Sequence, residues 1–243
     1  MSKGKFYIGT SGWNYKHWKD KFYPEDVRIK DWLSFYTEKF DTVELNGSFY
    51  HLPKRDTFKN WKKHTPDNFI FSVKASRYIT HNKKLKDPKD PVRNFYKGAN
   101  GLGKKLGVTL FQLPPNLNFD EEKLKHFINI LPTTKRYTIE FRNDTWWNDE
   151  VYKMLKNKNI AFCIFELEKT LTPKILTADF VYLRLHGPGG KYKGSYTKSA
   201  LSHWAKDFRK WSRKGKDVYC YFDNDEKAYA PNNALELIKI LKA

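Results

Sequence analysis

Residues 182–186 read Tyr-Leu-Arg-Leu-His, a run in which polar side chains alternate with leucines. Residues 138–142 (Thr-Ile-Glu-Phe-Arg) and 42–46 (Thr-Val-Glu-Leu-Asn) repeat this alternation. Successive side chains of a strand point to opposite faces, so each run has one apolar face and one polar face. In a parallel α/β protein the apolar face packs against helices, which turns the polar face inward. The three runs therefore predict buried strands with charged groups near their carboxyl ends.

Strand-like runs recur along the chain, and helical patterns separate most of them. The expected strands are residues 6–10, 42–46, 69–75, 108–113, 137–142, 160–166, 180–186 and 218–222. Eight strands alternating with helices over about 250 residues match a closed (β/α)8 barrel of TIM type. We therefore expect an α/β fold with residues 1–243 in one barrel domain, irregular around the sixth helix, where Pro173 limits any helix to about two turns. A doubly wound open sheet is the alternative, although no Gly-x-Gly-x-x-Gly turn follows the first strand.

The composition is that of a folded and strongly basic protein. The 243 residues include 46 Lys+Arg against 27 Asp+Glu, a formal net charge of +19, and 17% are aromatic. A disordered basic tail lacks such an aromatic content, so disorder is excluded. The apolar runs are too short to span a membrane, and we expect a cytoplasmic protein. Cys163 and Cys220 lie inside apolar strands, which predicts buried thiols rather than a disulfide.

Basic residues are concentrated in segments 82–105 and 206–216. The first segment carries eight Lys/Arg against two Asp, and the second carries six against one. Such patches attract polyanions, including nucleic acids, with an affinity that weakens as salt rises. A solvated surface without a partner is the alternative interpretation. The sequence leaves both open, together with the oligomeric state.

The carboxyl ends of the expected strands supply the candidate functional residues, because barrel enzymes carry their sites there. Carboxylates and imidazoles in such positions transfer protons, so the candidate catalytic residues are Glu44, Glu140 and His186. Cationic side chains suit an anionic substrate, and aromatic ones suit stacking on a ring. The candidate substrate-binding residues are Trp13, Asn46, Tyr50, Lys74, His81, Gln112, Arg142, Trp146, Arg184, Asp223 and Asn224. Internal ion pairs and loop packing are the alternative roles.

Two of these residues are expected to meet. Arg184 and Glu140 come from strands that face each other across a barrel, so we expect Arg184 to approach Glu140 through the interior. If that pair is structural, removal of the arginine destabilises the fold.

No metal or cofactor is expected. The sequence has no His-x-His, His-Glu-x-x-His or Cys-x-x-Cys spacing, and three cations in the expected interior oppose a metal ion. The absence of a dinucleotide fingerprint makes redox chemistry less favoured. The glycine-rich run at 187–190 is interpreted either as a backbone phosphate site or as a flexible loop.

Several short motifs give a family resemblance. They are Gly9-Thr10-Ser11-Gly12-Trp13, Glu44-x-Asn46-x-x-Phe49-Tyr50, Gln112-x-Pro114-Pro115, Glu140-Phe141-Arg142, Arg184-Leu185-His186-Gly187 and Tyr221-Phe222-Asp223-Asn224. From about Phe6 to its end the chain resembles the domain of unknown function 72 (YecE-like) family. The resemblance implies a TIM-type barrel and no particular activity. Such sequences often read Phe-Asn-Asn where this chain has Asp223, so the resemblance implies no essential aspartate there.

The sequence as a whole predicts an enzyme that acts on a phosphate-bearing or other anionic substrate at the barrel mouth. Carboxylate acid–base chemistry of the hydrolase or lyase type is the expected reaction class. A nucleic-acid-binding or processing protein is one alternative, because a net charge of +19 is combined with many aromatic residues. A non-catalytic binding scaffold is the other. No membrane partner is expected.

Overall fold

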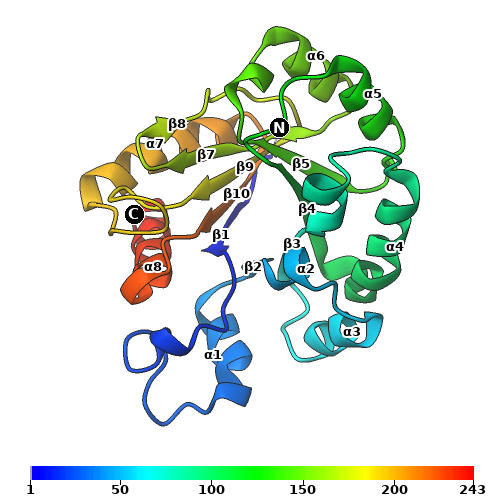
Figure 1. Cartoon of the computed structure of the whole chain (residues 1–243). Coiled ribbons are helices and arrows are strands. Elements are labelled where there is room, and N and C mark those ends of the chain that lie inside the picture. Colours follow the sequence, from blue (N-terminus) through cyan, green and yellow to red (C-terminus); the bar gives the residue numbers. More distant parts are fainter. Residues whose placement is uncertain (1) are drawn as a thin grey trace. The chain divides into compact units, whose positions relative to one another are not determined.

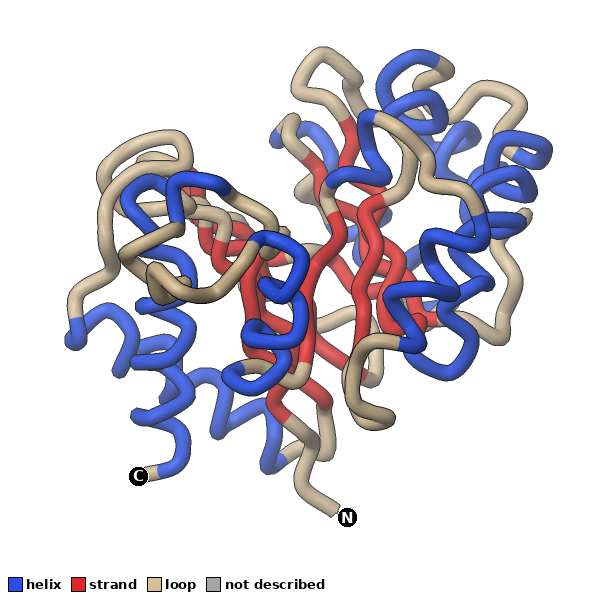
Figure 2. The backbone as a smooth tube through the Cα atoms, turned by 90° about the horizontal axis from the view of Figure 1, so that it is seen from below, coloured by secondary structure: helices blue, strands red, loops and turns tan. Residues whose placement is uncertain are grey.

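The computed structural model describes residues 2–243 and divides the chain into two compact units (Figure 1). The first unit contains the chain up to Glu44 together with residues 164–172 and 179–243. The second contains residues 45–163 and 173–178. Each unit combines helices with a mainly parallel sheet, and Figure 2 shows helices (blue) packed along the strands (red). The expected α/β class is thus confirmed.

The first unit is built on a sheet with the strand order β1-β10-β9-β7-β8. Neighbouring strands are parallel except for β7 and β8, which are antiparallel. Its elements are β1 (Phe6–Thr10), α1 (Trp32–Lys39), β7 (Ile164–Leu167), β8 (Thr170–Leu171), β9 (Phe180–Leu185), α7 (Lys198–Arg213), β10 (Asp217–Phe222) and α8 (Tyr229–Lys242). Helix α8 packs against β1 and β10, and α7 packs against β10.

The second unit has the parallel strand order β3-β4-β5-β6. The chain enters this unit through β2 (Thr42–Leu45). Its further elements are α2 (Gly47–Tyr50), α3 (Arg55–Lys63), β3 (Ile70–Lys74), α4 (Lys89–Ala99), β4 (Leu106–Leu113), α5 (Glu121–Asn129), β5 (Arg136–Phe141), α6 (Asp149–Asn157) and β6 (Ala161–Phe162). Short helical segments across the two units are η1 (Lys16–Trp18), η2 (Ile29–Asp31), η3 (Tyr78–Asn82), η4 (Asn100–Lys105), η5 (Asp144–Trp146) and η6 (Glu226–Ala228).

Local sequence explains where several helices begin. Asp120 accepts a hydrogen bond from the backbone N–H of Lys123 at 2.9 Å, which caps α5. Asn148 caps α6 in the same way, and Thr197 caps α7. Within α5, the periodic apolar residues Leu124, Phe127 and Ile128 are buried, as the sequence pattern predicts. None of the helices formed by residues 2–243 is long and apolar enough to cross a lipid bilayer.

The predicted strand at residues 160–166 differs from the structure. Phe162 pairs with Ile139 in the second unit, whereas Ile164 pairs with Leu183 in the first. Cys163 separates the two pairings, so a single apolar run forms β6 and β7. Among the described residues the strand pairings give two sheets and do not show one closed barrel.

The irregular segment expected around Pro173 is present. Between Leu167 and Phe180 the described chain forms the short strand β8 and no helix. Both cysteines are buried and neither forms a disulfide, as the sequence predicts.

Candidate functional site

The strand register of the first unit brings distant polar residues to one face of the sheet. Arg184 on β9 stands opposite Tyr221 on β10, which stands opposite Gly9 on β1. Side chains two positions further along each strand lie on the same face, at the carboxyl end. The first-unit cluster formed there consists of Ser11, Glu44, Tyr182, Arg184, His186 and Asp223, and all six are buried.

Arg184 is the centre of the first-unit cluster. Its guanidinium donates Nε–H to both carboxylate oxygens of Glu44 at 3.1 Å, and Nη2 reaches Glu44 Oε1 at 2.9 Å. The same Nη2 lies 2.9 Å from Oδ2 of Asp223. With 1% of its side chain exposed, Arg184 is a buried cation held between two carboxylates. Such groups are stable inside a protein only when they are paired and hydrogen-bonded.

Glu44 receives further hydrogen bonds. The hydroxyl of Tyr182 donates to Oε2 at 2.6 Å, and the hydroxyl of Ser11 donates to Oε1. Two hydroxyls and a guanidinium thus fix both oxygens of a fully buried carboxylate. The arrangement suits a residue that positions Arg184.

His186 and Asp223 form a second contact within the first-unit cluster. Nδ1 of His186 lies 3.0 Å from Oδ2 of Asp223, and Nε2 lies 3.4 Å from Nη1 of Arg184. The imidazole is fully buried between the rings of Phe165 and Tyr192. Asp223 is the more accessible partner, with 10% of its side chain exposed.

The electrostatic potential around the first-unit cluster is negative. Burial raises the pKa of Tyr15 well above its ordinary value, and the carboxylates of Asp223 and Asp225 raise it further. Burial followed by the charge of Asp223 also raises the pKa of Asp225. For Tyr182, burial and then the charge of Glu44 raise the pKa. The two carboxylates of the cluster thus outweigh its one guanidinium.

The second unit gathers polar residues by the same geometry. Gln112 on β4 stands opposite Glu140 on β5, and Lys74 on β3 stands opposite Leu110, two residues before Gln112 on the same face. The second-unit cluster consists of Lys74, His81, Glu140 and Arg142.

Glu140 is the one carboxylate of the second-unit cluster. It is fully buried, and Oε1 accepts a hydrogen bond from Nε of Arg142, whose side chain is 9% exposed. This contact confirms the expectation that the side chains of residues 140 and 142 lie on the same face, close to each other. Sγ of Cys163 lies 3.9 Å from the other oxygen, Oε2.

Lys74 and His81 share an aromatic neighbour in the second unit. Nζ of Lys74 lies 4.2 Å from the centroid of the Phe49 ring, a cation–π contact, and Lys74 is 8% exposed. The His81 ring meets the same phenylalanine edge to face at 4.9 Å. Burial lowers the pKa of His81 to about 4, and the charges of Lys74 and Arg77 contribute to this lowering. The potential in this cluster is therefore positive, and His81 is neutral at physiological pH.

The remaining candidate residues lie in varied surroundings. Trp146 is fully buried, stacks on Phe141 and donates its indole N–H to the carbonyl of Leu117 at 2.6 Å. Tyr50 is 65% exposed. Trp13, Asn46 and Gln112 are half-buried, whereas Asn224 is buried and donates hydrogen bonds to Gly194 O and to Asn233 Oδ1.

Three backbone groups of the glycine-rich loop already have partners. The N–H of Gly187 donates to the Tyr196 hydroxyl, that of Gly189 to the Lys193 carbonyl and that of Gly194 to Glu226. The loop is thus held by its own hydrogen bonds.

Sequence reasoning missed Ser11 and Tyr182 as members of the first-unit cluster. Tyr182 precedes Arg184 by two positions, so strand alternation alone places both on one face. Ser11 has no such signal, because its contact with Glu44 depends on a pairing between distant segments. The expected approach of Arg184 to Glu140 joins residues of different units and stays a prediction. Among residues 2–243, no group of three or more His, Cys, Asp and Glu side chains is placed to hold a metal ion.

The structure is that of an α/β protein with buried polar clusters at the carboxyl ends of parallel strands. The chain belongs to the family described as "Protein of unknown function DUF72", whose model matches residues 7–243. This confirms the resemblance carried by the motifs.

Known relatives agree with this assignment. UPF0759 protein YunF of Bacillus subtilis is 26% identical, and the match covers 97% of this chain and 94% of that protein. UPF0759 protein YecE of Escherichia coli is 31% identical over 139 residues, which are 56% of this chain and 48% of that protein.

Solved structures of the same family share the fold. A DUF72 family protein from Thermotoga maritima is 31% identical, with a TM-score of 0.89 over 98% of this chain and 100% of that one. A DUF72 family protein from Enterococcus faecalis has a TM-score of 0.79 at 20% identity and covers 100% of both chains. At that identity the likeness supports the fold alone.

Proposed function

We propose that this protein is an enzyme that binds a small phosphate-bearing or carboxylate-bearing substrate at the second-unit cluster. The observation that carries the proposal is the charge balance of that cluster. Lys74 and Arg142 are cationic and almost fully buried, while Glu140 is the single carboxylate of the cluster. A bound anion would complete the neutralisation. Burial and then the charges of Lys74 and Arg77 lower the pKa of His81, so this neighbouring imidazole does not add a further positive charge.

The residues of the second-unit cluster divide the chemistry between them. A guanidinium grips a carboxylate or phosphate in a bidentate fork, and an ammonium adds a point charge, so Arg142 and Lys74 hold the anion. Glu140 transfers the proton as general acid or base. A carboxylate beside a bound anion can transfer the proton in a hydrolysis or an elimination. Neutral His81 supplies a hydrogen-bonding group. In this scheme Glu44 and His186 act within the first-unit cluster, where they hold Arg184 and Asp223.

Two matched pairs of variants test the anion site. Lys74→Met and Lys135→Met each remove one ammonium, and Lys135 lies outside the cluster with its own aromatic contact to Tyr96 at 5.1 Å. Arg142→Gln and Arg136→Gln alter opposite ends of the β5 segment. Metabolites retained by the purified protein are identified by mass spectrometry, and thermal stabilisation by phosphate, pyrophosphate and dicarboxylates is measured.

The expected outcome is that Lys74→Met and Arg142→Gln lose the retained anion and the stabilisation, whereas both control variants keep them. Glu140→Gln should keep the anion and lose turnover of the retained compound. If the unaltered protein retains no anion and none of these anions stabilises it, the enzyme proposal fails and the non-catalytic scaffold is favoured.

We also propose that the two sheets are parts of one TIM-type barrel. The support is the run at residues 160–166, which pairs with β5 at its start and with β9 at its end. A run that pairs with a strand on each side in this way is compatible with a closed barrel, in which every strand has two neighbours. A crystal structure of this chain with two separate open sheets would refute this arrangement.

A cytoplasmic location is part of the proposal. Two buried thiols outside any disulfide, Cys163 and Cys220, suit a reducing compartment. Cell fractionation followed by immunoblotting tests it, and recovery in the extracellular fraction would contradict it.

A further inference from the structure

A cationic groove lies in the second unit, apart from the second-unit cluster. It has a volume of about 550 Å³ and runs between helix α3 and segment η4. The residues that line this α3 groove are Arg55, Lys59, Lys62, Lys63, Thr65, Asp67, Asn100, Gly101, Gly103 and Lys105. Five of them are cationic and one is acidic, a formal balance of +4.

Close packing of η4 on α3 gives the α3 groove fixed walls. A Cβ added at Gly101 would lie 2.6 Å from the carbonyl oxygen of Arg55 and 2.9 Å from Cβ of Phe58, so only glycine permits this approach. Gly103 has a φ of +56°, and a Cβ there would lie 3.1 Å from Nζ of Lys62. The two glycines hold the loop against the helix and the Lys62 ammonium beside the loop.

Lys105 stabilises the base of the α3 groove through its hydrogen bonds. Its buried ammonium donates to the carbonyl of Lys62 at 2.8 Å, and to the carbonyl and hydroxyl of Thr65 at 2.7 and 3.2 Å. Lys62 lies in the last turn of α3 and Thr65 follows its end, where carbonyl groups lack helical partners. Burial lowers the pKa of Lys105. Lys105 is therefore a structural cation, and the exposed lysines are the groups that meet a ligand.

The exposed cations of α3 form one row. Lys59, Lys62 and Lys63 are separated by three and four positions, which places them on one side of the helix with about 5–6 Å between neighbouring Cβ atoms. Lys59 also pairs with Asp56 at 3.1 Å. Like charges at this spacing repel one another. A bound anion would offset this repulsion between the three lysines.

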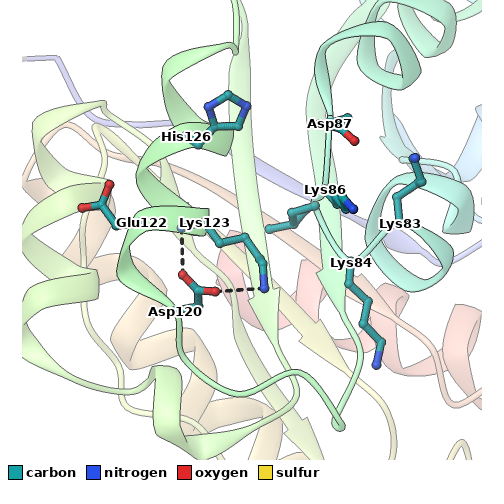
Figure 3. Close-up of a pocket in the computed structure, with 9 residues that line it drawn as sticks. Lys83, Lys84, Lys86, Asp87, Asp120, Glu122, Lys123 and His126 are labelled. Atoms are coloured by element: carbon teal, nitrogen blue, oxygen red, sulfur yellow. Dashed lines mark hydrogen bonds and ion pairs between the residues drawn. The ribbon is translucent and has the colours of Figure 1, made fainter.

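A second groove of the same unit has a much smaller excess of positive charge than the α3 groove. It has a volume of about 530 Å³ and is lined by Lys83, Lys84, Leu85, Lys86, Asp87, Asp120, Glu122, Lys123 and His126 (Figure 3). Its four lysines face three carboxylates, and Lys123 is paired with Asp120 at 2.9 Å. Grooves of nearly equal size thus differ in formal balance by three charges.

We propose that the α3 groove binds the phosphate backbone of a nucleic acid without reading its sequence. Its cations are suited to phosphates, and among the described residues that line it there is no aromatic ring on which a base would stack. The net charge of +19 favours a long polyanion over a single phosphate group. The groove shares no residue with the second-unit cluster, so this proposal is independent of the proposed enzyme activity.

The test compares two double variants with the same change in net charge. Lys62→Glu with Lys63→Glu alters the α3 groove, and Lys84→Glu with Lys86→Glu alters the groove of Figure 3. Binding of fluorescent single-stranded and double-stranded oligonucleotides is measured by anisotropy between about 50 and about 200 mM salt. All four lysines are exposed or half-buried, and thermal melts check that both variants fold.

The α3 variant should bind at least about tenfold more weakly, and its salt slope should fall by about 2, roughly one per lost phosphate contact. The control variant should retain affinity within about threefold. Equal losses in both variants would show attraction to net charge alone and overturn the proposal. Displacement of the oligonucleotide by an equimolar amount of tripolyphosphate would also overturn it, because it would indicate a small-phosphate site. The proposal would also be overturned if the unaltered protein bound no oligonucleotide at the lowest salt.

Discussion

The polar clusters of the two units use similar residues with opposite charge balance. In the first unit one guanidinium, that of Arg184, is held by two carboxylates and two hydroxyls make further hydrogen bonds to Glu44. In the second unit two cations, Lys74 and Arg142, accompany the single carboxylate of Glu140. The alternation of polar and apolar residues in the sequence is the same for both. We propose that the difference reflects two roles of buried charge, stability in the first unit and ligand binding in the second.

The largest effect is expected from Arg184→Ala. Removing the guanidinium leaves Glu44 and Asp223 buried without their cation, which should cost about 3–5 kcal/mol of unfolding free energy. Urea denaturation measures the loss. Arg93→Ala, which removes an exposed ion pair with Asp90, is the control and should cost at most about 1 kcal/mol.

Double-mutant cycles identify the partner of Arg184. Combined with Glu44→Gln, Arg184→Ala should show a coupling energy of about 1–3 kcal/mol, since the two groups share hydrogen bonds. A parallel cycle with Glu140→Gln tests the predicted approach of Arg184 to Glu140. Strict additivity with Glu44→Gln would contradict the structural role assigned to the first-unit cluster.

A smaller loss is expected from Tyr182→Phe. The substitution removes the hydroxyl that donates to Glu44 at 2.6 Å and keeps the ring in the core. A hydrogen bond to a charged group contributes about 1.5–3 kcal/mol, so the unfolding free energy should fall by about that amount. Tyr50→Phe, at an exposed position, serves as the control in the same urea titrations. Equal stability of Tyr182→Phe and the unaltered protein would show that the hydroxyl is dispensable.

Lys74→Met should change stability little. The variant loses a largely desolvated cation–π contact of about 2 kcal/mol, and this loss is offset because an apolar side chain replaces an ammonium that is only 8% exposed. We therefore expect a change within about 1 kcal/mol in urea denaturation. A loss as large as that of Arg184→Ala would abolish the distinction between a structural cluster and a binding cluster.

A further prediction concerns pH. His81 has a pKa of about 4 in the folded protein, against 6.5 ordinarily, so the unfolded chain binds more protons between these values. This residue should therefore lower stability as the pH falls from about 6.5 towards 4. Thermal melts across this range should show a shallower decline for His81→Asn. Lys74→Met, which removes one cause of the lowered pKa, should reduce the slope as well, and unchanged slopes in both variants would refute the assignment.

Strand alternation predicts which charged residues are buried, but not how they are paired. The sequence places Glu44, Glu140 and Arg184 on polar faces, and all three are buried in the structure. The contacts of Ser11 and Asp223 with this network depend on the pairing of β1, β10 and β9, whose register no local pattern specifies. Sequence spacing does predict the neighbourhood of Glu140 and Arg142, because the two residues lie on one face of the same segment.

Aromatic residues and strand ends show a second limit of sequence reasoning. Trp146 follows a strand, as a stacking platform would, yet its indole N–H binds a backbone carbonyl and its ring packs on Phe141. A stripe of aromatic residues is compatible with both roles until the packing is known. The run around Cys163 reads as one strand, because a change of pairing partner leaves no signature in an apolar segment.

The pairing of β1 with β10 has a consequence for biosynthesis. Tyr7 stands opposite Tyr219, and the backbone of Lys5 is bonded to the side chain of Asp217, 212 residues later. At a synthesis rate of about 5–20 residues per second, β1 waits on the order of 10–40 s for its partner strand. Residues 45–163 and 173–178 are made during that interval, so the second unit is complete in sequence first. The nascent chain must therefore keep the apolar side chains of its first 44 residues from aggregating while the rest is translated.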